Sequence, residues 1–148
     1  MAENYVANEE YSKALRQLKL ALRVCDSTEM KWIIYYNIAV VYFYLEDIDY
    51  SKGYLRKAQI IRDAEEIHLL FAQIYTKEQN FTAAEEEYKY LIKINPKNID
   101  YALQLTNIYV LNKNYLKARK VLKNYVKSNP TDKNNPRFKN YGALKLFL

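Results

Sequence analysis

This chain of 148 residues has few of the residue types that interrupt helices or build redox and metal sites. It contains two glycines, Gly53 and Gly142, three prolines, one histidine and one cysteine, Cys25. A single cysteine excludes an internal disulfide and a zinc cluster built on cysteine pairs. Isolated glycines exclude a glycine-rich phosphate loop. No nucleophile and base can be paired from their spacing, so we expect a protein that is not an enzyme and holds no cofactor or metal.

Long apolar runs are also absent. No run approaches the length of a membrane-spanning helix, and the N-terminus lacks the basic and apolar regions of a signal peptide. We therefore expect a soluble, cytoplasmic chain with no membrane span, unless a leader has been removed from the natural protein. Few helix breakers, together with abundant Lys, Glu, Leu and Ala, favour helix.

The net charge of +6 is distributed unevenly. Residues 1–88 carry fifteen acids and ten bases, a net charge of −5, whereas residues 89–148 carry two acids and thirteen bases, a net charge of +11. A basic half of this kind could attract acidic proteins, nucleic acid or anionic lipid.

The second half of the chain consists of two similar blocks, residues 65–98 and 99–132. When the first block is shifted by thirty-four residues, the same apolar and small residues recur in the second. The matching pairs include Tyr75 with Tyr109, Asn80 with Asn114, Ala84 with Ala118 and Pro96 with Pro130. A fixed period of this size predicts stacked helical repeats, and hence an all-α fold.

The same pattern extends toward the N-terminus. Residues 29–64 form a second repeat, and residues 2–28 form a shortened first one, in which Tyr5 and Tyr11 fall at the ends of two successive helices. The first helix lacks its opening turns, so the chain begins within a repeat. Either Met1 is a native start or the chain was cut from a longer array, and we favour the cut.

Short polar sequences mark where the helices begin and end. Asp26, Asp63 and Asn98 are the expected N-caps, with Glu29 completing a capping box after Asp26. Asn95-Pro96 and Asn129-Pro130 should end helices, because proline disfavours helix in the residue before it. In residues 133–148, Phe138, Tyr141, Leu144 and Leu148 have helical spacing. This tail is either a terminal capping helix or the first helix of a missing repeat.

These residues resemble the tetratricopeptide repeat, a helix–turn–helix unit with small and aromatic residues at fixed positions. The resemblance implies a right-handed α-solenoid of antiparallel helix pairs that forms a single domain over residues 1–148. Tyr125 and Thr106 replace residues that are small in the pattern, so the fourth repeat should pack more loosely. Sel1-like and pentatricopeptide repeats are alternatives, but the Asn-Pro endings favour the tetratricopeptide pattern.

The resemblance also implies a concave face, lined by the first helix of each repeat, where a peptide or helix of a partner protein binds. Asn37 falls where the family often uses an asparagine to bind a peptide backbone, and its aromatic neighbours would anchor apolar groups. Alternatively, those aromatic residues pack against the first repeat or a missing part of the chain. The predicted groove comprises Ile33, Tyr36, Asn37, Val40, Phe43, Tyr44, Leu69, Gln73, Lys77, Leu103 and Asn107.

Basic residues recur on the second helix of each repeat. Stacked repeats would align them as a ridge formed by Lys89, Lys93, Lys117, Lys120, Lys123 and Lys127. Such a ridge could contact phosphates or an acidic protein. We favour the simpler interpretation of a solvated helix face, offset by Glu85, Glu86 and Glu87. His68 is expected to be a packed histidine rather than a ligand or catalyst.

The sequence therefore predicts an interaction scaffold whose main partner is another protein. Binding of nucleic acid or an anionic surface through the basic ridge is the alternative. A further alternative is a scaffold fragment of a larger enzyme or secretion component. The terminal repeats could also join copies of the chain.

Overall fold

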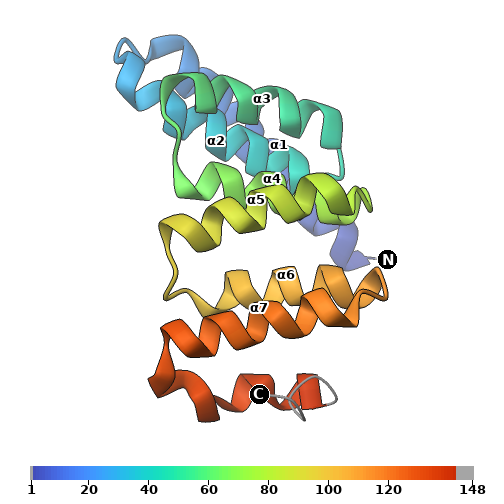
Figure 1. Ribbon diagram of the computed structural model, residues 1–148. Coiled ribbons are helices and arrows are strands. Elements are labelled where there is room, and N and C mark those ends of the chain that lie inside the picture. The colour runs from blue at the N-terminus through green and yellow to red at the C-terminus, as the bar shows by residue number, and fades with distance from the viewer. Residues whose placement is uncertain (1, 143–148) are drawn as a thin grey trace. The chain divides into compact units, whose positions relative to one another are not determined.

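The computed structural model describes residues 2–142, with side chains from residue 8 onward. Within this range the regular structure is entirely helical (Figure 1), which confirms the all-α prediction. The α-helices are α1 (Ala2–Val24), α2 (Thr28–Tyr44), α3 (Ile48–Ile61), α4 (Glu65–Lys77), α5 (Phe81–Ile94), α6 (Ile99–Leu111) and α7 (Tyr115–Ser128). Two 3-10 helices follow, η1 (Pro130–Asn134) and η2 (Pro136–Tyr141).

The chain divides into an N-terminal part that ends at Ile74 and a C-terminal part that begins at Tyr75. The N-terminal part contains α1, α2, α3 and most of α4. The C-terminal part contains α5, α6, α7 and both 3-10 helices. The single domain inferred from the family resemblance stays a prediction.

Three turns of the same construction end the first helix of a pair and begin the second. Glu46, Gln79 and Lys113 each adopt a positive φ, between 56° and 63°, at equivalent positions of successive repeats. The next residue donates its amide to a carbonyl five residues back, as when Asn114 N bonds Tyr109 O at 2.7 Å. This is the hydrogen bond of a Schellman motif, which ends a helix at a left-handed residue.

In all three turns the residue after the left-handed one is also the N-cap of the next helix, and in two of them its side chain makes the capping hydrogen bond. The Asn80 side chain accepts from Ala83 N, and the Asn114 side chain accepts from Lys117 N. The turn at Lys113 and Asn114 therefore needs only a few residues, and α6 and α7 run antiparallel. Figure 1 shows this arrangement for α6 and α7.

The first repeat differs from its prediction. Where the pattern predicts a helix, a turn and a second helix, residues 2–24 form the single continuous helix α1. The position equivalent to Asn80 and Asn114 is occupied by Glu10. Glutamate is a poor N-cap in comparison with asparagine, so nothing favours a turn at this point and the helix continues.

Two predicted N-caps are also wrong. Ser27, not Asp26, caps α2, because its hydroxyl accepts from Met30 N at 3.2 Å. Asp63 lies two residues before α4, and its carboxylate contacts His68 Nε2 at 2.9 Å and Gln59 Nε2 at 3.0 Å. The prediction for Asn98 is confirmed, since its side chain accepts from Asp100 N.

Small side chains bring α2 and α3 close together in the N-terminal part. Ala39, Ser51 and Ala58 are completely buried. The Ser51 hydroxyl donates to the Ala39 carbonyl oxygen at 2.7 Å, so the one polar group among them is paired. Larger side chains at these positions would force the two backbones apart.

The larger residues of the fourth repeat are accommodated by hydrogen bonds. Thr106 is completely buried, and its hydroxyl donates to the Ala102 carbonyl oxygen at 2.7 Å. The Tyr125 hydroxyl lies 2.6 Å from Asp132 Oδ2 and 3.1 Å from the Lys97 carbonyl oxygen. Burial, and then the Asp132 carboxylate, raise the pKa of Tyr125, so the hydroxyl keeps its proton as a donor. Tyr125 thereby joins the end of α7 to the turn before α6.

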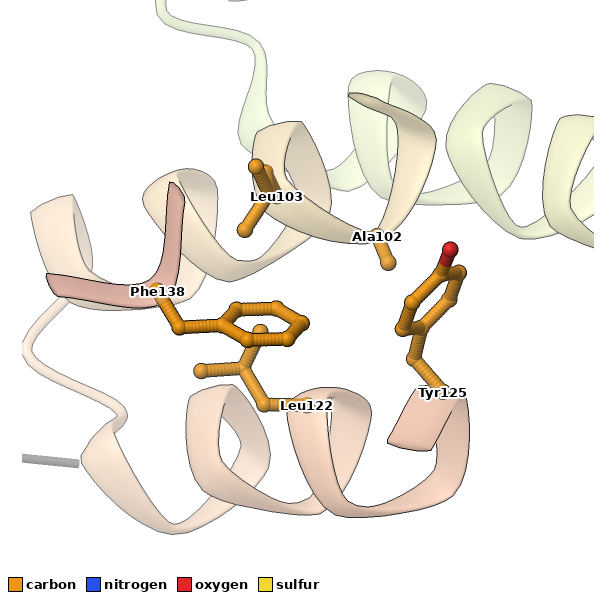
Figure 2. Packing of buried hydrophobic residues seen from close by; sticks show 5 residues of the cluster. All are labelled: Ala102, Leu103, Leu122, Tyr125 and Phe138. Carbon is orange, nitrogen blue, oxygen red and sulfur yellow. The ribbon is translucent and has the colours of Figure 1, made fainter. Parts of the chain in front are cut away.

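The segment after α7 completes the core of the C-terminal part. Phe138 of η2 is completely buried and packs with Leu103 of α6 and Leu122 of α7 (Figure 2). The Tyr125 ring lies 6.2 Å from the Phe138 ring at 68°, an edge-to-face contact. The predicted terminal helix is therefore a short 3-10 segment over its described residues. Leu144 and Leu148 lie outside the described part of the chain.

Gly53→Ala should stabilise the protein. Gly53 lies inside α3 and has no positive φ, and a Cβ placed on it would meet no atom within 4 Å. Alanine loses less backbone entropy in a helix, so we expect the free energy of unfolding to rise by roughly 0.5–1 kcal/mol. Urea denaturation followed by circular dichroism measures the change. A Gly53→Ala variant that is no more stable than wild type would contradict the expectation.

Phe138→Ala should be strongly destabilising. It removes a completely buried ring from the contact between α6 and α7 and leaves a cavity. The expected loss in the free energy of unfolding is about 3–5 kcal/mol. Leu116→Ala is a suitable control, because Leu116 is 81% exposed. Equal stability of the two variants would show that η2 does not hold the core together.

Candidate functional site

Helix α2 has more apolar surface than its neighbours in the N-terminal part cover. Its buried residues are Ile38, Ala39, Val41 and Tyr42. Tyr42 stacks on Tyr50 and Tyr54 of α3, with ring centroids 5.1 and 5.7 Å apart. These contacts account for the side of α2 that faces α3.

Helix α1 covers another side of α2. The ring of Tyr11 stacks on that of Tyr44 with centroids 5.5 Å apart and planes within 5°. Lys19 Nζ donates to the Tyr42 hydroxyl at 3.0 Å. Tyr44 therefore takes part in a contact between helices, although its side chain is 56% exposed. The centroids of the Phe43 and Tyr44 rings lie 5.7 Å apart in an edge-to-face arrangement. The sequence left open that the aromatic residues near Asn37 pack against the first repeat, and Tyr44 does so through Tyr11.

The remaining predicted groove residues of α2 lie on the face that Tyr44 continues, one turn beyond Val40. Ile33, Tyr36, Asn37 and Val40 follow the i, i+3, i+4, i+7 spacing of one helix face. Ile33 is 37% exposed, Asn37 is exposed, and Tyr36 and Val40 are half-buried. Burial, and then the negative charge of Glu66 on α4, raise the pKa of Tyr36. The face therefore combines apolar surface with an amide and a neutral hydroxyl.

The α4 residues of the predicted groove differ in exposure. Leu69 is half-buried and Gln73 is exposed, and both belong to the N-terminal part with α2. Lys77, at the end of α4, is exposed and belongs to the C-terminal part.

The equivalent face of α6 is covered by the chain itself. Leu103 is only 6% exposed and packs against Phe138. Asn107 accepts a hydrogen bond from the Tyr141 hydroxyl at 2.6 Å. Arg137 also forms an ion pair with Asp100 at the start of α6. Leu103 and Asn107 thus contact η2, and we leave them out of the surface offered to a partner. The helical spacing of Phe138 and Tyr141 could be seen in the sequence, but their contacts with Leu103 and Asn107 of α6 could not.

Comparison with known protein families identifies the repeats. A family model described as tetratricopeptide repeat matches residues 75–138. No curated protein matches the chain. The match covers the end of α4, then α5, α6, α7 and η1, and the first half of η2.

Tetratricopeptide repeats generally serve as protein–protein interaction modules and typically as scaffolds without catalysis. Among the helices of residues 2–142, none is long and apolar enough to cross a membrane. Over the same residues, no group of three or more His, Cys, Asp or Glu side chains is placed to hold a metal ion. His68 is buried and contacts the Asp63 carboxylate.

The predicted basic ridge lies on α5 and α7, the second helices of two tetratricopeptide repeats. Lys93, Lys123 and Lys127 are exposed, as are Lys117 and Lys120. Glu85 partly neutralises the ridge, since its carboxylate lies 2.5 Å from Lys89 Nζ and 3.8 Å from Lys117 Nζ. The ridge as a binding surface stays a prediction.

Glu85 should give the C-terminal part an acid-sensitive contribution to stability. Its partial burial acts to raise its pKa, but hydrogen bonds from Lys89 and Tyr109 and the nearby lysine charges bring the pKa below the usual 4.5. A depressed carboxyl pKa stabilises the folded state above the unfolded pKa, and this stabilisation is lost as pH falls through the folded value.

We therefore expect Glu85→Gln to lower the melting temperature at pH 7, with the difference from wild type shrinking below about pH 4.5, the unfolded value. Thermal melts at pH 7 and pH 3 test this. Glu86→Gln is the matched control, because Glu86 is the exposed neighbour of Glu85. A difference for Glu85→Gln that is constant with pH would contradict the assignment.

Proposed function

We propose that this protein is a non-catalytic interaction module that binds a segment of a partner protein. The binding surface is the face of α2 formed by Ile33, Tyr36, Asn37 and Val40, extended by Leu69 and Gln73 of α4. The general role of tetratricopeptide repeats supports the class of function. The exposed apolar and amide groups of α2 support the location.

The single observation that carries the proposal is the incomplete cover of an apolar helix. Helices α1 and α3 cover two sides of α2, and Ile33 still presents a third of its surface beside the exposed Asn37. An apolar side chain of a partner would bury Ile33 and parts of Tyr36 and Val40. The Asn37 amide both donates and accepts, so it can pair with the backbone of an extended segment.

The chemistry of this face favours a neutral or weakly charged partner segment. The negative charge of Glu66 adds to burial in raising the pKa of Tyr36. Ile33, Tyr36, Asn37 and Val40 themselves carry no charge. Binding there should therefore depend weakly on salt. Binding of nucleic acid through the lysines of α5 and α7 would instead weaken steeply as salt rises, since phosphate contacts release counterions. A salt titration separates the two functions.

A photo-crosslinking side chain at Gln73 should identify the partner. Gln73 is exposed at the edge of the proposed surface, so the substitution should leave the fold intact. The same group placed at Ile60 of α3, which is 85% exposed, is the control. We expect a protein to be captured from position 73 and not from position 60. The same proteins captured from both positions would contradict the location.

Binding of the captured partner should then depend on the face of α2. Ile33→Ser combined with Asn37→Ala removes the partly exposed Ile33 side chain and the exposed Asn37 amide. This change should lower the affinity by about tenfold or more, as expected for central interface residues. Arg56→Ala combined with Ile60→Ser on α3 is the matched control. Isothermal titration measures affinity and circular dichroism checks that helicity is unchanged. Unaltered affinity of the α2 variant would reject the surface.

A further inference from the structure

A cavity of about 390 Å³ lies among α5, α6 and α7 of the C-terminal part. Its floor is apolar and comes from α6, with Ala102, Leu105 and the ring of Tyr109. Its walls come from α5 and the turn after it, and from α7. The wall residues are Lys89, Ile92, Pro96, Lys117, Lys120, Val121, Asn124, Tyr125 and Ser128.

Hydrogen bonds and ion pairs join α5 to α7 at both ends of this cavity. At one end, Glu85 of α5 contacts Lys117 at the start of α7. At the other end, the Tyr125 hydroxyl contacts the Lys97 carbonyl, and Asn129 Nδ2 donates to the Pro96 carbonyl at 3.0 Å. Lys117 and Tyr125 are separated by roughly 12 Å along the helix. The cavity is therefore held open as an elongated trough.

The bulk of Tyr125 explains why the space exists in this repeat. The tetratricopeptide pattern has a small residue at this position, which lets the helices approach. The ring of Tyr125 occupies the position here and forms part of the wall. Its hydroxyl is fixed by the two oxygens that it contacts, so the ring cannot turn out to release the space without losing both contacts.

The trough is electrically asymmetric along its length. Lys89, Lys117 and Lys120 surround one end, and Glu85 is the carboxylate that contacts the first two, which leaves a net charge of +2. Lys117 Nζ lies 5.3 Å from the centroid of the Tyr109 ring, over the apolar floor. The other end carries the neutral groups of Asn124 and Ser128.

We propose that this trough binds a small amphiphilic anion. The ligand would have one carboxylate or phosphate head at the lysine end and an aliphatic or aromatic body along Leu105, Val121 and Ile92. The volume lies within the range of small-molecule sites, which are mostly apolar with a few placed polar groups. The site lies in the C-terminal part, so the proposal goes beyond the protein-binding face of α2 and does not depend on it.

Titration of the full chain with decanoate tests the proposal. Decanol supplies the body without the charge, and acetate supplies the charge without the body. Isothermal titration and amide chemical shifts follow binding. We expect decanoate to bind at least about tenfold more tightly than decanol, because a hydrogen bond to a charged group adds that much affinity, and acetate to show no binding.

Variants assign the binding to the trough. Lys117→Gln combined with Lys120→Gln should weaken decanoate about tenfold and leave decanol unchanged. Lys123→Gln combined with Lys127→Gln is the matched control on the same helix, because neither residue lines the trough. Val121→Phe narrows the trough and should weaken both ligands. Circular dichroism checks the fold of each variant.

Three results would overturn the proposal. Absence of decanoate binding would remove the site. Equal affinities for decanoate and decanol would show that the lysines recognise no anion. If the control variant Lys123→Gln with Lys127→Gln lost as much affinity for decanoate as Lys117→Gln with Lys120→Gln, decanoate would be responding to the overall positive charge of α7 and not to the trough.

Discussion

A helix in one of these repeats cannot cover its own apolar face, and the rest of the structure depends on which neighbour covers it. In the C-terminal part the neighbour at the end of the series is η2, which inserts Phe138 between Leu103 and Leu122. In the N-terminal part α1 stacks Tyr11 on Tyr44 of α2.

The same constraint distinguishes two faces that the sequence pattern treats as equivalent. On α6, Tyr141 donates to Asn107, and Leu103 is buried, so the chain's own segment occupies the face. Aligned on the left-handed residues Glu46 and Lys113, the equivalent residues of α2 are Tyr36 and Val40, which are half-buried. A partner segment on α2 would cover the positions that η2 covers on α6. This parallel supports the location of the proposed surface on α2.

Two residues of the fourth repeat, Thr106 and Tyr125, are larger than the residues that the tetratricopeptide pattern has at their positions, and each changes the packing around it. Thr106 fits because its hydroxyl bonds the carbonyl one turn back, and it leaves no unpaired polar group in the core. Tyr125 fits by reaching the Lys97 carbonyl and Asp132, and the space it maintains is the trough between α5 and α7. The sequence predicts looser packing in this repeat. The structure has a space among α5, α6 and α7, with polar contacts between helices at both of its ends.

The sequence by itself determined the helices, their pairing and most of their ends, because apolar periodicity, asparagine caps and prolines act through neighbouring residues. It also marked Asn37 and Ile33 on one helix face. Tertiary structure alone decided that Leu103 and Asn107 are covered, and that Lys89, Lys117 and Lys120 surround one end of a cavity. These outcomes depend on contacts between residues distant in the chain, whose geometry a repeat pattern does not encode.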